Sequence, residues 1–299
     1  MRGSAKIAIG ATAIATAVVL SACGSTASSS GSTADSGSTA SSGSTASPST
    51  AADFHLVNPG YLTVATHGTE APEISISLSG VLGGADGAWI NAFAQQHHLK
   101  IKLFETTFSS AILAVQDGKA DVGVAAYYSA ARAKAVFFTY PFYQEDAAVL
   151  TLPGFKYTGP ASLTGKPVGT VTGFVWQPYL QKVFGSDLHT YPDTATIGQA
   201  LLNGSIVGYF DTVTANTLAP LTAANTKTYV ISAGQFGMPE SVLVDIARNY
   251  VNCSNTGLAT AMNATLASLH QSGAWASILT ANHLTSIFDP TLTTEPNGC

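Results

Sequence analysis

Few residues of this 299-residue chain are spaced for covalent or metal chemistry. The segment Gly204-Ser-Ile-Val-Gly208 places its serine one position too early for a Gly-x-Ser-x-Gly nucleophile elbow. No His-Glu-x-x-His motif occurs, and the seven histidines are scattered apart from His97-His98, at a predicted helix end where a capping or solvated role is commoner than metal binding. The sequence therefore predicts no catalytic residue, no metal site and no cofactor.

The first of the three cysteines lies where an exported chain is processed. Cys23 follows Leu20-Ser21-Ala22, a pattern that resembles the bacterial lipobox, in which the cysteine is lipidated and becomes the mature N-terminus. The apolar run before it, after two basic residues, is typical of an export signal, and its length of about 14 residues falls short of the roughly 20 that a spanning helix needs. We therefore predict a lipoprotein signal peptide at 1–22 and at least two acyl chains on Cys23, because one chain binds membranes only marginally. An ordinary signal peptide that contains a cysteine is the alternative.

The other two cysteines, Cys253 and Cys299, form an even pair in a chain expected to be exported. Disulfides persist in oxidising compartments, so we predict a bridge that holds the C-terminal tail. Closing a loop of about 45 residues stabilises by roughly 4 kcal/mol in the chain-entropy model. Two unrelated thiols are the alternative.

The segment after Cys23, up to residue 53, consists almost wholly of Ser, Thr, Gly and Ala. It has little apolar surface to bury and cannot offset the entropy of ordering. We predict a flexible tether, whose roughly 29 residues give a mean reach of about 30 Å.

Composition excludes several functions for the remaining body. Only 10% of residues are charged and the formal net charge is −5, with no basic stripe, so nucleic acid is a poor partner. No second apolar run approaches the roughly 20 residues of a membrane span. A body of roughly 245 residues is long enough for two lobes with separate cores.

Strand and helix patterns alternate along the body, which favours an α/β fold with mostly parallel sheets. The pattern restarts after about residue 150, which indicates two similar lobes. Strands are predicted at 61–65, 100–104, 121–125, 167–171, 206–210, 229–232 and 241–246. Helices are predicted at 85–99, 109–117, 177–183, 196–202, 213–219, 256–272 and 274–281.

Residues from about 60 to 284 resemble the periplasmic-type solute-binding proteins of polar amino acid uptake systems, the family 3 proteins with the type 2 periplasmic-binding fold. Six segments carry the resemblance through their order and spacing. They are Pro59-Gly-Tyr-Leu-Thr-Val64, Ala114-Val-Gln-Asp-Gly-Lys-Ala-Asp121, Phe138-Thr-Tyr-Pro-Phe-Tyr143, Leu163-Thr-Gly-Lys-Pro-Val-Gly169, Ala200-Leu-Leu-Asn-Gly204 and Ser272-Gly-Ala-Trp275.

The resemblance implies a two-lobed clamp with two hinge strands, built from mixed sheets flanked by helices, that closes on one small solute. Lobe 1 would comprise 54–148 plus 236–299, and lobe 2 would comprise 149–235. It further implies a monomer that delivers its solute to the permease of an ABC transporter. With the lipid anchor, the expected location is the extracytoplasmic face of the cell membrane.

In lobe 1, this sequence departs from the family at the positions that contact ligand. The family often has an aromatic pair after the first strand, where this chain has Glu70 and Glu73. Tyr127 and Tyr128 lie where a small Ser/Thr cluster is usual. Arg132 follows one position early, and the family's arginine at this place grips the ligand's α-carboxylate through paired hydrogen bonds. A surface salt bridge is the alternative role for Arg132.

In lobe 2, the family's Gly-Thr-Thr loop becomes Thr172-Gly-Phe-Val-Trp176, so the hydroxyls give way to Phe174 and Trp176. Asp211 follows the predicted strand at the place where the family has a carboxylate for the ligand's ammonium group. Its alternative is an N-cap for a helix that begins at Val213.

These departures suggest an acidic cleft with aromatic walls. Carboxylates and aromatic faces both favour cations, the faces by about 0.5–2 kcal/mol each. We therefore predict an amine-bearing solute, either an amino acid or a cationic amine. Solvated loop positions for Glu70 and Glu73 are the alternative.

Two other functional classes remain open at this stage. A sensor module would use the same anchor and tether without a transporter. An enzyme of the dehydratase type on the same fold would need a carboxylic acid with a raised pKa, a role open to Glu70 or Glu73. We expect binding rather than catalysis.

Overall fold

The computed structural model describes residues 54–284 and 298–299 of the chain. The predicted signal peptide, the lipidated Cys23 and the tether up to residue 53 lie outside the described residues. Within the described part, no helix is both long enough and apolar enough to cross a membrane.

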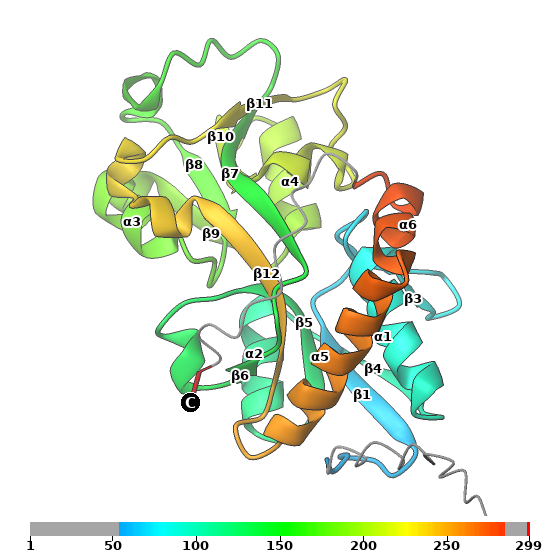
Figure 1. The fold of residues 1–299 in the computed structure, drawn as a ribbon. Helices are drawn as coiled ribbons and strands as arrows, with labels where there is room; N and C mark the ends of the chain where they lie inside the picture. The colour runs from blue at the N-terminus through cyan, green and yellow to red at the C-terminus, as the bar shows by residue number, and fades with distance from the viewer. Residues whose placement is uncertain (1–53, 285–297) are drawn as a thin grey trace, which may run out of the picture. The chain divides into compact units, whose positions relative to one another are not determined.

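The first lobe is built on three parallel strands. Strand β1 (Tyr61–Thr66) lies between β4 (Lys100–Glu105) and β5 (Val122–Tyr127) and pairs with both in parallel. Helices α1 (Gly84–Gln96) and α2 (Phe108–Gln116) connect them, and the short strands β2 (Ser75–Ile76) and β3 (Leu82–Gly83) form a separate two-stranded sheet before α1. The C-terminal helices α5 (Thr256–Gln271) and α6 (Ala274–Ala281) complete this lobe (Figure 1).

The second lobe repeats the plan. Strands β8 (Val168–Val171), β9 (Leu188–Tyr191) and β10 (Gly208–Thr212) are parallel, with β8 in the centre. Helices α3 (Gln177–Phe184) and α4 (Thr194–Leu202) connect them, and β11 (Lys227–Val230) follows. Short 3₁₀ turns span Arg132–Lys134, Pro160–Leu163, Gly185–Asp187, Val213–Thr217, Gln235–Gly237 and Glu240–Val242.

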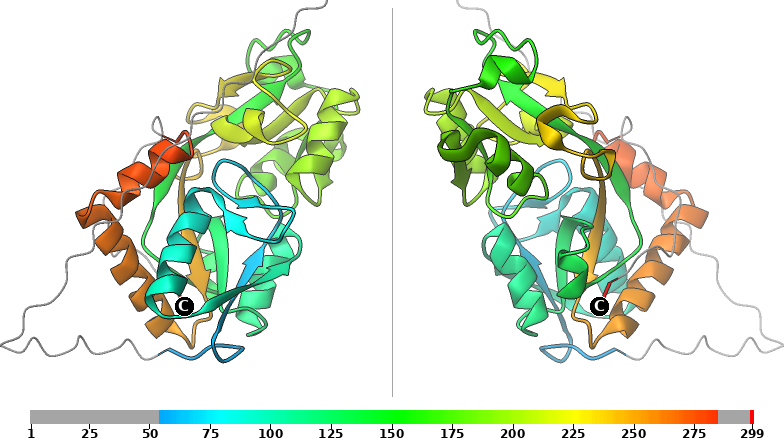
Figure 2. Two further views of the ribbon diagram at one scale, coloured as in Figure 1. Left: turned by 90° about the vertical axis from the view of Figure 1, so that its right-hand side faces the viewer. Right: turned by 90° about the vertical axis from the view of Figure 1, so that its left-hand side faces the viewer.

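Two long antiparallel strands join the lobes. Strand β7 (Tyr143–Thr151) pairs with β12 (Val244–Val251), and the sheet order is β4-β1-β5-β12-β7-β10-β8-β9. Strand β11 also pairs with β7, and the short β6 (Phe137–Phe138) pairs with β12. In the large sheet, β4, β1 and β5 of the first lobe pair in parallel, and so do β10, β8 and β9 of the second. The hinge strands β7 and β12 pair antiparallel with their neighbours (Figures 1 and 2). The predicted fold class, a two-lobed α/β clamp with mixed sheets, is confirmed.

Local sequence signals explain where several elements begin and end. Helix α2 begins after Thr107, whose side chain accepts a hydrogen bond from the amide of Ser110. Gly118 follows the helix with φ of +68°, a conformation that glycine adopts without strain. Helix α4 likewise begins after Asp193, which accepts from the amide of Thr196 at 2.7 Å. Each lobe therefore has a helix whose first turn is capped by a side-chain oxygen.

Three predicted elements differ from the structure. Strand β10 runs on to Thr212, so Asp211 lies inside the strand opposite Ala148 of β7 rather than after it. The predicted helix at 213–219 is only a 3₁₀ turn. The predicted strand at 241–246 begins later, at Val244, and continues to Val251 because it pairs with β5 of the first lobe and with the other hinge strand, β7.

The structure joins Cys253 and Cys299 in a disulfide, as predicted from the cysteine count. The bridge connects the segment after β12 to the end of the chain, and the two cysteines are 46 positions apart in sequence. The amide of Cys299 also donates to the carbonyl of Ala133, so the C-terminus is held against the first lobe.

Candidate functional site

A small cavity lies where the two lobes meet beside the hinge strands. Its volume is about 30 Å³, room for about one or two water molecules. In the first lobe, the lining residues come from the segment after β1, the start of α2, the end of β5 and the start of β7. In the second lobe, they come from the loop after β8, the end of β10 and the segment that follows it. The lining residues are His67, Glu70, Glu73, Phe108, Ala125, Tyr127, Tyr143, Glu145, Phe174, Asp211, Thr212, Thr214 and Leu218. None of these residues is a lysine or an arginine.

The structure brings most of the predicted contact residues to this cavity and leaves others out. The predicted residues that line it are Glu70, Glu73, Tyr127, Phe174 and Asp211. The predicted residues that do not line it are Tyr128, Arg132 and Trp176.

Glu73 is positioned by a tight loop between β1 and helix α1. Glu70 and Ile74 exchange both backbone hydrogen bonds at 2.8 Å, which closes the loop. The carbonyl of Glu73 accepts from the amide of Asp86 at 3.0 Å, at the start of α1. Gly84 has φ of +82°, and a Cβ there would lie 2.3 Å from the Glu73 carbonyl oxygen. Only glycine at position 84 therefore lets this loop pack against the helix start and turn Glu73 inward.

Glu73 and Glu145 form a buried acidic pair, and each side chain is 4% exposed. Glu145 lies on β7 and accepts hydrogen bonds from Tyr127 Oη at 2.9 Å and Thr214 Oγ1 at 2.5 Å. Burial raises the pKa of Glu73 well above its ordinary value, and the nearby charge of Glu145 adds to the shift. Burial also raises the pKa of Glu145, although its hydroxyl donors oppose the shift. The pair therefore tends to keep a proton.

Asp211 adds a carboxyl group from the second lobe. It is 5% exposed and accepts hydrogen bonds from Tyr209 Oη and from the amide of Thr212. Burial raises its pKa well above the ordinary value, and the charge of Glu70 raises it further. The predicted N-cap alternative does not apply, because Asp211 lies within β10 and the following 3₁₀ turn has no side-chain cap.

His67 supplies the basic group of the cavity. Its Nδ1 lies 3.4 Å from Glu70 Oε1, and its ring packs edge-on against Phe108 with centroids 5.0 Å apart. Burial lowers the pKa of His67, but the charge of Glu70 and the hydrogen bond to it outweigh burial, so the pKa is raised. His67 and Glu70 thus balance each other's charge.

Arg132 bridges the two lobes. Its Nη1 donates to the carbonyl of Tyr127 at 2.6 Å, and its Nη2 donates to the carbonyl of Gly173 in the second lobe at 2.8 Å. Its guanidinium carbon lies 4.8 Å from the centroid of the Phe108 ring. Gly173 has φ of +89°, and a Cβ there would lie 3.0 Å from Ser109 Oγ. The arginine is buried in this contact and donates to main-chain carbonyls on both lobes.

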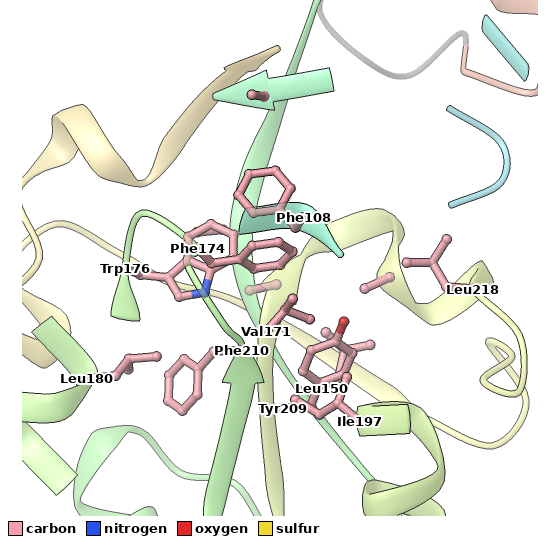
Figure 3. Close-up of a cluster of buried hydrophobic side chains, with 14 of the residues drawn as sticks. Phe108, Leu150, Val171, Phe174, Trp176, Leu180, Ile197, Tyr209, Phe210 and Leu218 are labelled. Atoms are coloured by element: carbon pink, nitrogen blue, oxygen red, sulfur yellow. The ribbon is translucent and has the colours of Figure 1, made fainter. Parts of the chain in front are cut away.

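The aromatic residues form a wall that is continuous with the core of the second lobe. Phe174 packs edge-on against both Phe108 and Trp176, with ring centroids 5.3 Å apart in each case (Figure 3). Trp176 is 1% exposed and donates through Nε1 to Thr170 Oγ1, so it supports Phe174 from behind. Tyr128 instead packs against Phe138, away from the cavity.

A larger cavity lies on the other side of the Glu145–Thr214 hydrogen bond. It has a volume of about 620 Å³, and both Glu145 and Thr214 line it together with Pro72, Asn216 and residues at the end of α6. The hydrogen bond between these two side chains is therefore a thin partition between the two spaces.

Sequence reasoning missed two acidic or basic members of the site, Glu145 and His67. A signal for Glu145 existed: it shares the inward face of β7 with Tyr143 and Ala147, since alternate residues of a strand face the same side. A carboxyl group on this face of the strand is buried together with its apolar neighbours. His67 follows β1 directly and had no distinguishing pattern.

The chemistry open to this cavity is recognition of cations. Carboxyl groups from both lobes and from the hinge converge on it, with hydroxyl and aromatic neighbours. In the described residues, no group of three or more His, Cys, Asp or Glu side chains has the geometry to hold a metal ion.

Comparison with family models identifies a match over residues 62–283 to the bacterial extracellular solute-binding proteins, family 3. No match to curated protein sequences reaches significance.

Solved structures share the fold at low sequence identity. An arginine-specific periplasmic binding protein of Salmonella typhimurium is 22% identical, with a TM-score of 0.65 over 74% of this chain and 98% of its own. The arginine-, lysine- and histidine-binding protein ArtJ of Geobacillus stearothermophilus is 17% identical, with a TM-score of 0.65 over 77% of this chain and 97% of its own. A histidine kinase sensor domain is 18% identical, with a TM-score of 0.65 over 77% of this chain and 98% of its own.

Proposed function

Because the chain belongs to the bacterial extracellular solute-binding proteins of family 3, we propose that it binds a small amine-bearing solute between its lobes and delivers it to an ABC uptake transporter. One observation carries the choice of solute: carboxyl groups from both lobes line the cavity, and no lysine or arginine lines it. Buried carboxylates need a counter-charge, and an ammonium or guanidinium group supplies one.

The solute enters when the lobes part. The cavity of about 30 Å³ holds no more than about two waters, far less than the few hundred Å³ of a typical ligand pocket. Strands β7 and β12 are the covalent links at which a hinge motion opens such a fold. The larger space beyond Glu145 and Thr214 offers additional volume if their hydrogen bond breaks on binding.

The proposed location is the outer face of the cell membrane. A lipid on Cys23 would hold the body there through the tether of residues 24–53. The disulfide between Cys253 and Cys299 suits an oxidising compartment. Radiolabelled fatty acid should enter the wild-type chain but not a Cys23→Ala variant.

Signalling is the second candidate, since a histidine kinase sensor domain shares the fold. A sensor and a transporter component would bind the same solute but have different consequences. A strain that lacks the gene should lose uptake of the solute if the chain serves transport. If uptake is unchanged and only a transcriptional response to the solute disappears, the chain serves signalling.

Ligand screening tests the proposed solute class. In a thermal shift assay, amines or basic amino acids at about 100 times their Kd should stabilise the protein by roughly 2.7 kcal/mol. Glu73→Gln should weaken that binding by about ten-fold or more, because a hydrogen bond to a charged group contributes about 1.5–3 kcal/mol. Glu240→Gln is the matched control, since Glu240 is exposed in the 3₁₀ turn Glu240–Val242. Stabilisation by dicarboxylates or neutral sugars alone would contradict the proposal.

A further inference from the structure

Acidic side chains in the cavity outnumber the cations that balance them. Glu73 and Asp211 are buried on opposite lobes, and Glu145 lies between them on β7. His67 is the basic side chain that lines the cavity, and it is paired with Glu70 at 3.4 Å. Three carboxyl groups therefore remain without a counter-charge among the lining residues.

One carboxyl oxygen also remains without a donor. Glu73 Oε1 is buried and has no hydrogen-bond partner among the described residues. In contrast, both oxygens of Glu145 accept hydrogen bonds, from Tyr127 and Thr214. A buried acceptor without a donor is costly and rare in folded proteins. A ligand N–H group that reaches Glu73 would remove that cost.

The distribution of charge sets the charge expected of the ligand. Burial and the nearby charge of Glu145 raise the pKa of Glu73, so a cation that reaches the pair favours its ionised form. Asp211, on the other lobe, accepts from Tyr209 and Thr212 and provides a second negative charge when ionised. Two negative sites on opposite lobes match two cationic groups on one ligand.

A ligand carboxylate would find no comparable partner. Arg132, the candidate for that role, does not line the cavity and donates to the carbonyls of Tyr127 and Gly173. To grip a carboxylate in the cavity it would have to leave those carbonyls and its stack on Phe108. Any lining carboxyl group that is ionised would also repel a ligand carboxylate.

The geometry points to a ligand that is a compact organic dication without a carboxylate, with one amine or guanidinium group at the Glu73–Glu145 pair and the other at Asp211. This inference rests on the proposed binding of an amine-bearing solute and narrows its class. Because each cationic group contacts a different lobe, the ligand would also hold the lobes together.

Calorimetric titration with matched probes tests the inference on the full mature chain. The pairs are cadaverine with lysine and agmatine with arginine, which differ only by the carboxylate, and n-pentylamine is the monocation control. Cadaverine or agmatine should bind at least about ten-fold more tightly than its amino acid, and cadaverine at least about ten-fold more tightly than n-pentylamine. Tighter binding of lysine or arginine would overturn the dication inference and leave the proposed function intact. No binding of any probe would count against both.

Two substitutions locate the second cationic site. In Asp211→Asn, the preference for cadaverine over n-pentylamine should disappear, since the second charge loses its partner. Asp117→Asn, at the exposed end of α2, should keep that preference. A general loss of fold in Asp211→Asn would weaken both probes equally and would not change their ratio relative to wild type. An unchanged ratio in a folded Asp211→Asn protein would therefore overturn the placement.

Discussion

Asp86 ionises at an unusual pH because of its surroundings in the first lobe. The side chain is fully buried near the start of α1, where Oδ1 accepts from Asn249 at 2.8 Å and Oδ2 has no partner among the described residues. Burial raises its pKa to about 7, although the hydrogen bond from Asn249 and the charge of His67 oppose the shift. Asp86 thus behaves like the acids of the cavity, although it lies in the core.

This raised pKa predicts the direction in which stability depends on pH. The folded state keeps a proton on Asp86 that the unfolded state releases. Asp86 therefore costs no stability below about pH 4, and the unfolding free energy falls as the pH rises to about 7. The cost above pH 7 is on the order of 4 kcal/mol. The raised pKa values of Glu73, Glu145 and His67 act in the same direction. Unfolding free energy measured with urea should therefore be lower at pH 8 than at pH 5.

Asp86→Asn should flatten this pH profile and raise stability at pH 8 relative to wild type. The exposed Asp117→Asn is the control and should keep the wild-type slope. A wild-type stability that rises from pH 5 to pH 8 would contradict the assignment.

At the scale of elements, the lobes touch through the loop that follows β8. Arg132 reaches the carbonyl of Gly173, and Ser109 Oγ donates to the carbonyl of Thr172 at 3.1 Å. The edge-on contact of Phe108 with Phe174 lies between these bonds. These contacts hold the lobes together.

The Arg132 bridge predicts a measurable shift between closed and open forms. Arg132→Gln should increase the radius of gyration of the ligand-free protein in small-angle scattering, since it removes a charged bond across the lobes. Lys134→Gln is the control, because Lys134 lies exposed in the same 3₁₀ turn. An unchanged radius in a folded Arg132→Gln protein would show that the bridge does not set the closure.

Element positions were predictable wherever the local signal and the tertiary role agree. Helices α3 and α4 and strands β1 and β4 lie within a few residues of the predicted ranges. Asp193 caps the start of α4, and apolar residues alternate with lysines along β4. Strand β12 was misplaced because its length depends on its pairing with β5 and β7, which are distant in sequence. The end of β10 was missed for the same reason, since its pairing with β7 extends it past Asp211.

The site was predictable only in part. The resemblance directed attention to the loop after β1 and to Asp211, and these residues do meet in one cavity. It could not show that Arg132 bonds to main-chain carbonyls, because that depends on how the lobes approach. Trp176 and Tyr128 contact residues outside the cavity. Their partners, Thr170 and Phe138, were not identifiable from the spacing of residues in the sequence.

For the whole molecule, the account depends on acids from two lobes and a hinge strand acting on one solute. In a two-lobed fold, a ligand that contacts both lobes stabilises the closed form by its differential affinity for that form. Ionised carboxyl groups attract the cation, and the bound cation in turn favours ionisation. Binding of an amine should therefore lower the raised pKa values of Glu73, Glu145 and Asp211.

Carboxyl-carbon NMR of the side chains of Glu73, Glu145 and Asp211 tests this claim most directly. In the ligand-free protein, these resonances should titrate above the ordinary range of Glu and Asp. Saturating cadaverine, or lysine if it is the tighter ligand, should move their midpoints to lower pH. Ordinary midpoints in the free protein, or midpoints that do not move when an amine is bound, would contradict the account.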